Sequence, residues 1–173
     1  MSLCKSTAAL ILASSLSSQA PAALPENCVS EAEAVAVFAA MMPDMIDGLR
    51  GKCAAHLPAN AFLVASGDAL IARYKVLADQ RWPAAKLAFG RIAGDEELTS
   101  KMPDQYLRPL IGSVVGSELI KDIKIEDCAG ANRIVESLAP LPPENVATLV
   151  GTIVVLADDK KGQKDSFPIC KAQ

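Results

Sequence analysis

Aromatic side chains and histidine are scarce in this sequence. Its 173 residues include one Trp, two Tyr, four Phe and a single histidine, His56. A β-sandwich draws on aromatic and β-branched residues for its strands, so this composition argues against one. The abundant Ala, Val, Leu and Ile favour closely packed helices instead. With one histidine, the chain also has few groups that could act as a general base near neutral pH.

The usual signatures of zinc, nucleic-acid and membrane-spanning proteins are missing as well. No two cysteines stand two to four residues apart, as they do in structural zinc sites. The net charge of −3 gives no basic excess for a nucleic-acid partner. No apolar stretch reaches the roughly 20 residues that cross a bilayer. We therefore expect no metal, no cofactor, no nucleic-acid partner and no membrane span in the mature chain.

The first 22 residues have the pattern of a secretory signal peptide. Lys5 supplies a positive start, residues 6–16 carry no charge, and Ala20-Pro21-Ala22 fits a small-residue cleavage site. Cleavage before Ala23 leaves residues 23–173 as one helical domain and removes one positive charge with Lys5. We therefore expect a periplasmic or secreted protein.

The same cleavage removes Cys4 and leaves an even set of four cysteines: Cys28, Cys53, Cys128 and Cys170. An even set in an oxidising compartment predicts two disulfides, and four cysteines allow three pairings. Cys28 and Cys53 flank two predicted helices, and Cys128 and Cys170 flank a second helical pair with its tail. The preferred pairing is therefore Cys28–Cys53 with Cys128–Cys170, each closing one helical hairpin.

Helical periodicity runs through most of residues 30–156. Ser30 and Glu33 have the spacing of a capping box, and Gly94 has the position of a helix stop. Pro43 is expected to end the first helix and to open a second over residues 44–55. Pro83, after Trp82, is expected to begin another. The pattern predicts an all-α, single-domain bundle of six or seven helices stapled by two disulfides.

Arginine and aromatic residues recur between positions 73 and 91. Arg73, Arg81, Trp82 and Arg91 are predicted to contribute to a binding face, because Trp and Arg are enriched at protein interfaces. The first hypothesis is therefore a secreted or periplasmic binding or interaction module with a protein or small-molecule partner. It assigns no catalytic residue.

The second hypothesis is a hydrolase or lyase that acts on cell-envelope material through paired carboxylates. Glu96 or Glu97 would act with Asp104 or Glu118, since a carboxyl with a raised pKa can serve as an acid beside an ionised one. A serine hydrolase is not expected, because no G-x-S-x-G motif occurs. The carboxylate hypothesis requires acids from distant segments to converge in one cleft.

Overall fold

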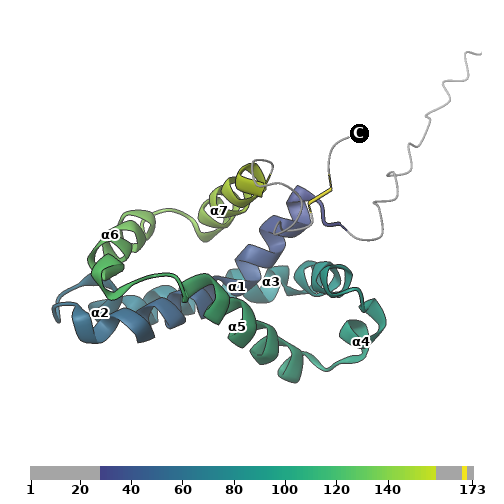
Figure 1. Ribbon diagram of the computed structural model, residues 1–173, viewed down its shortest axis with the longest axis horizontal. Coiled ribbons are helices and arrows are strands. Elements are labelled where there is room, and N and C mark those ends of the chain that lie inside the picture. Colours follow the sequence, from purple (N-terminus) through teal and green to yellow (C-terminus); the bar gives the residue numbers. More distant parts are fainter. Residues whose placement is uncertain (1–27, 159–168, 171–173) are drawn as a thin grey trace, which may run out of the picture.

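The computed structural model describes residues 28–158 together with 169 and 170 (Figure 1). Within these residues the elements are α1 (Glu31–Cys53), η1 (Ala54–His56), α2 (Phe62–Ala65), α3 (Gly67–Ala93), α4 (Glu96–Lys101), α5 (Asp104–Ile120), η2 (Ile125–Asp127), α6 (Cys128–Leu138) and α7 (Pro143–Asp158). The predicted all-α class is confirmed. The predicted leader, residues 1–22, lies outside the described residues. None of the helices described here combines the length and apolar character that a membrane crossing requires.

Helix α1 is the central element, and α3, α5 and α7 pack against it. Close approach depends on small residues at these contacts. A Cβ atom on Gly151 of α7 would lie 2.7 Å from Val35 Cγ2, and one on Gly112 of α5 would lie 2.8 Å from Asp44 Cγ. The cluster between α1 and α3 includes four buried alanines, Ala34, Ala40, Ala85 and Ala88. The many alanines of the chain therefore allow the close helix packing that the composition predicts.

Helix α1 continues through Pro43, where the sequence predicts a break. A proline inside a helix removes one backbone hydrogen bond, because it has no N–H. Burial on both sides offsets this loss, since Met42 and Ile46 belong to one core cluster. Helix α3 likewise runs through Pro83, with Ala85 fully buried two residues after the proline. The predicted helix boundaries at Pro43 and Pro83 are therefore wrong.

The cysteines pair as Cys28–Cys170 and Cys53–Cys128, so two disulfides are present but the preferred pairing is wrong. The 23 residues of α1, at a rise of 1.5 Å each, separate its ends by about 34 Å. A disulfide needs Cα atoms roughly 4.4–6.8 Å apart, so one cannot join Cys28 to Cys53 across a continuous helix. The hairpin on which that pairing depended does not form.

The two disulfides hold the two ends of α1. At its beginning, Val29 and Ile169 form a parallel bridge, and the Cys170 N–H donates to the Val29 carbonyl at 2.9 Å. At its end, Cys53 and Cys128 are both buried in the core, where α6 begins. Each disulfide therefore joins segments that are distant in sequence.

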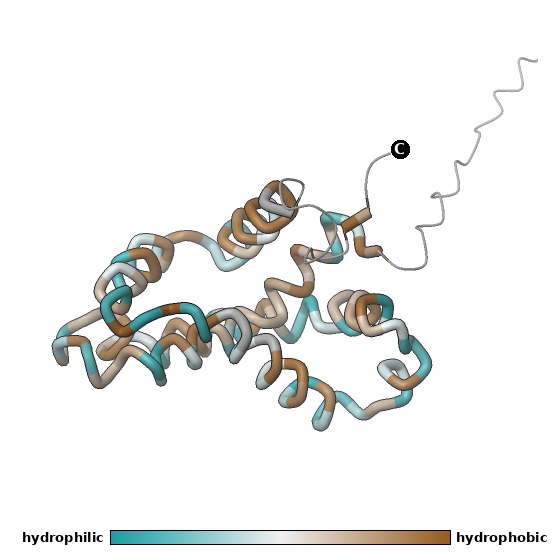
Figure 2. Tube along the Cα trace, viewed as in Figure 1, coloured by the Kyte–Doolittle hydropathy of each residue, from teal (hydrophilic) through white to brown (hydrophobic). Residues whose placement is uncertain are grey.

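Apolar side chains also lie on the outer faces of two helices. Exposed examples are Tyr106, Leu110 and Val114 on α5 and Leu149, Ile153 and Leu156 on α7. Hydrophobic residues accordingly colour much of the α7 tube in Figure 2. The apolar content of the chain is therefore shared between its core and its surface.

Candidate functional site

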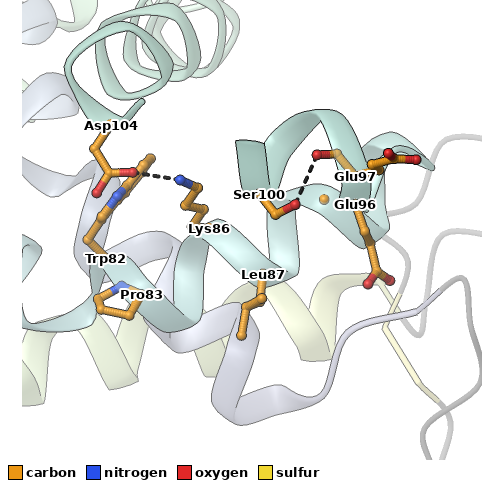
Figure 3. Close-up of a pocket in the computed structure, with 9 residues that line it drawn as sticks. Trp82, Pro83, Lys86, Leu87, Glu96, Glu97, Ser100 and Asp104 are labelled. Atoms are coloured by element: carbon orange, nitrogen blue, oxygen red, sulfur yellow. Dashed lines mark hydrogen bonds and ion pairs between the residues drawn. The ribbon is translucent and has the colours of Figure 1, made fainter. Parts of the chain in front are cut away.

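A cavity of about 580 Å³ lies between α3, α4 and the beginning of α5 (Figure 3). Its lining residues are Trp82, Pro83, Lys86, Leu87, Gly90, Glu96, Glu97, Ser100 and Asp104, and we call this cavity the α3–α4–α5 cleft. Figure 3 shows Trp82, Lys86 and Asp104 at one end of it and Glu96, Glu97 and Ser100 at the other. The volume lies in the range typical of small-molecule sites.

Helix α3 supplies the apolar wall of the cleft. Trp82, Lys86 and Gly90 follow one another at four-residue spacing and therefore share one face of the helix. Trp82 is buried at 3% exposure, whereas Leu87 is 60% exposed. The indole thus lies at the base of the cleft and the leucine at its rim.

A tight reversal places α4 opposite α3. Gly94 ends α3 in the left-handed region at φ 69°, and the Asp95 side chain then accepts from the Leu98 N–H at 2.8 Å to cap α4. A Cβ atom on Gly90 would lie 3.0 Å from the Glu96 Cα, so glycine at this position permits the close approach of α4. This brings Glu96 and Glu97 of α4 into the lining of the cleft.

Lys86 ties the start of α5 to α3. Its Nζ donates to the Met102 carbonyl at 2.9 Å and to Asp104 Oδ1 at 2.8 Å. The hydrogen bond from Lys86 lowers the pKa of Asp104, against the opposing effect of desolvation. Asp104 is therefore ionised where it pairs with Lys86, and it is poorly suited to act as a general acid.

Trp82 separates this cleft from a second cavity, of about 230 Å³, between α1, α3 and α5. On that second side Arg108 lies over the indole at 4.6 Å and pairs with Asp79. The indole N–H is buried without a hydrogen-bond partner among the described residues. It lies on the Asp104 side, near enough to help lower the pKa of that carboxyl although it does not meet hydrogen-bond geometry.

Asp44 lies in the second cavity, beside Gly112. Its side chain is accessible to solvent but forms no hydrogen bond or ion pair to a described residue. Desolvation by the surrounding helices and the nearby charge of Asp47 raise the pKa of Asp44, against the attraction of Lys75 and Arg108. This carboxyl therefore opposes folding when it is ionised.

The charges of the α3–α4–α5 cleft favour a cation. Three carboxylates and one ammonium line it, for a formal charge of −2. The ammonium of Lys86 is already engaged with Asp104, and Glu97 pairs with Lys101. Glu96 has no ion-pair partner in the described part of the chain and is the carboxylate most available to a ligand.

The four residues predicted for a binding face make separate contacts in the structure. Arg73 donates to the Leu141 carbonyl at 3.2 Å and holds the segment between α6 and α7. Arg91 pairs with Glu33 near the start of α1, and Arg81 is exposed. Trp82 is the member of the set that lines the cleft. The arginine that stacks on it comes from α5, because Arg108 is brought there by tertiary packing.

Three acids of the second hypothesis line the same cleft, but Asp104 lies at the opposite end of it from Glu96 and Glu97 (Figure 3). Glu96, Glu97 and Asp104 line one cleft, and the side chain of Glu118 lies outside what the structure describes. Lys86, Leu87 and Ser100 are lining residues that the sequence did not identify. The turn at Gly94 and the acidic run that follows it were the available signals.

The cleft shows no nucleophile with a base beside it. Ser100 Oγ donates to the Glu97 carbonyl at 2.9 Å. His56 is exposed just after the C-terminal end of α1 and does not line the cleft. Within the described residues no three His, Cys, Asp or Glu side chains are placed to hold a metal ion.

Comparisons with protein-family models, curated proteins and solved structures find no match to this chain. Its chemistry must therefore be argued from the cleft itself.

Proposed function

We propose that this chain is a periplasmic or secreted binding module that holds its ligand in the α3–α4–α5 cleft. The observation that carries the proposal is the cleft itself, an apolar wall around Trp82 facing the acidic wall of α4. A partly apolar pocket with a few fixed polar groups is the usual form of a ligand site.

The cysteines support the compartment. Two disulfides fit a protein that folds outside the reducing cytosol. The N-terminal pattern of residues 1–22 is the further reason to propose export. Mass spectrometry of the protein recovered from its native host should find Ala23 as the first residue and no free thiol among the remaining cysteines.

The cleft can be blocked by one substitution. Ser100→Phe would extend an aromatic ring into it from the exposed face of α4. Ser113→Phe is the matched control, because Ser113 is also exposed and also donates to the carbonyl three residues earlier, at 2.8 Å. The three proteins would be incubated with an extract of the host envelope and examined by native mass spectrometry.

The proposal predicts a ligand adduct on the wild type and on Ser113→Phe, and its loss on Ser100→Phe. An adduct that survives on Ser100→Phe would place binding elsewhere. Absence of any adduct on the folded wild type would count against a binding module.

A second candidate is the cell-envelope hydrolase or lyase. It is supported by the presence of Glu96, Glu97 and Asp104 in the lining of one cleft. Release of soluble fragments from purified envelope polymer, abolished in Asp104→Asn and in Glu96→Gln, would support it. No release above the buffer control would remove it.

A further inference from the structure

We infer that the ligand of the α3–α4–α5 cleft is a small organic cation with a flat apolar body. This inference rests on the proposed binding function and names the chemical class of its ligand. The geometry that points to it is an unpaired carboxylate, Glu96, across from the apolar surface of Trp82, Pro83 and Leu87.

The charge of the cleft selects the sign of the ligand. Its formal charge of −2 disfavours anions, and the only lining ammonium, Lys86, is occupied by the Met102 carbonyl and Asp104. An amine or amidine near Glu96 would gain an ion pair without breaking an existing one.

The dimensions of the cleft select a small molecule over an extended peptide. The acidic wall is α4, whose six residues span about 9 Å at 1.5 Å per residue. An extended peptide advances roughly 3.3 Å per residue, so fewer than three of its residues would face that wall. A single ring with a charged substituent fits the same length.

Trp82 contributes apolar surface to the cleft and no hydrogen bond to the ligand. Its indole N–H is buried from solvent on the Asp104 side, where it helps to lower the pKa of that carboxyl, so a ligand in the cleft does not reach it. A flat apolar body on the ligand would pack against this wall.

The test uses three probes of nearly equal size and shape: benzamidine, benzamide and benzoate. Trp82 is the only tryptophan in the chain, so its fluorescence reports on the cleft directly. For a ligand of only nine non-hydrogen atoms, we expect benzamidine to bind with a Kd on the order of 1 mM. Isothermal calorimetry on the same solutions provides a second readout.

Glu96→Gln removes the available carboxylate, and Glu136→Gln is its control. Glu136 is also exposed and lies on α6, at the opposite end of the molecule from α4 (Figure 1). Glu96→Gln should weaken benzamidine binding about fivefold, as expected for one partly solvated ion pair, and Glu136→Gln should leave it unchanged.

Selective binding of benzamidine, weakened by Glu96→Gln alone, supports the inference. Equal binding of benzamide or benzoate, or an unchanged Kd in Glu96→Gln, overturns the cationic class while the binding function stands. No benzamidine binding at concentrations of about 10 mM also overturns it. Binding of a six-residue peptide with one central arginine more than tenfold tighter than benzamidine would replace the small molecule by a peptide. The envelope-extract experiment with Ser100→Phe does not depend on ligand charge, so it tests the binding function separately.

Discussion

Removal of the Cys53–Cys128 disulfide should lower the free energy of unfolding of this protein more than any single substitution at its surface. The variant is Cys53→Ala with Cys128→Ala, which leaves Cys28–Cys170 intact. Both cysteines are buried in the main core cluster, and their disulfide joins the end of α1 to the start of α6. The loss therefore acts on both the unfolded chain and the packed core.

The magnitude follows from the length of the closed loop. The two cysteines are 75 residues apart, and the chain-entropy treatment of such a loop gives about 4.5 kcal/mol at 25 °C. Loss of two buried sulfur atoms adds about 1 kcal/mol. The sum, about 5–6 kcal/mol, is comparable to the whole stability of many domains, about 5–15 kcal/mol. At about 2–4 °C per kcal/mol for a domain of this size, Tm should fall by about 10–20 °C.

Urea unfolding followed by far-ultraviolet circular dichroism measures the free energy of unfolding of both proteins. Hydrogen exchange adds a local readout, because the Leu63 N–H donates to Asn132 Oδ1 at 2.9 Å where α2 meets α6. We expect faster exchange of the Leu63 amide in the variant. A loss below about 2 kcal/mol, with the Leu63 amide still protected, would refute the assignment of this disulfide as a major constraint on the fold.

Three further predictions concern single side chains. Asn132→Ala should lower the free energy of unfolding by about 1–3 kcal/mol in urea titrations, because it leaves the buried Leu63 N–H without an acceptor. An undiminished stability would contradict it. Desolvation acts to raise the pKa of Glu33, but hydrogen bonds from Ser30 and the ion pair with Arg91 lower this pKa below 4.5. Its contribution is therefore present above pH 4.5 and is lost as pH falls through the lowered pKa, so Glu33→Gln should cost about 1 kcal/mol at pH 7 and less at pH 3. A cost independent of pH would exclude this role. Asp44 has a raised pKa, so its effect on the pH dependence of stability is the reverse. Protonation of Asp44 favours the folded state, and stability should fall as pH rises above 3.8. Asp44→Asn should stabilise the protein at pH 7 by about 0.5 kcal/mol, given the solvent access of the side chain. Glu136→Gln is the control, because Glu136 is exposed on α6 and is not among the charges that shift the pKa of Asp44. Destabilisation by Asp44→Asn in thermal unfolding would contradict the desolvation argument.

Local signals in the sequence predicted the local structure well. The capping box of Ser30 and Glu33 is present at the start of α1, and Gly94 ends α3 in the left-handed region. These features depend on residues within a few positions of one another, so the sequence contains the whole interaction. The helical class and the even set of cysteines are of the same kind.

The prolines show where local reasoning stops. Pro43 and Pro83 carry a local penalty that predicts a helix end. The outcome depends on whether buried contacts on both sides outweigh that penalty, and those contacts come from other helices. The wrong cysteine pairing followed directly, because it assumed that the chain reverses at Pro43.

The candidate site shows the same division. Trp82 and the acids of α4 were visible as residue types, and Glu96 or Glu97 was already considered as a partner of Asp104 or Glu118. Their grouping depends on the reversal at Gly94 and on the close approach that Gly90 permits. The sequence by itself determined a helical, cysteine-paired chain with few catalytic groups, because composition, periodicity and caps are local properties. Tertiary structure alone decided which cysteines meet, that Arg108 stacks on Trp82, and that Glu96 faces an apolar wall, because these contacts join segments far apart in the chain.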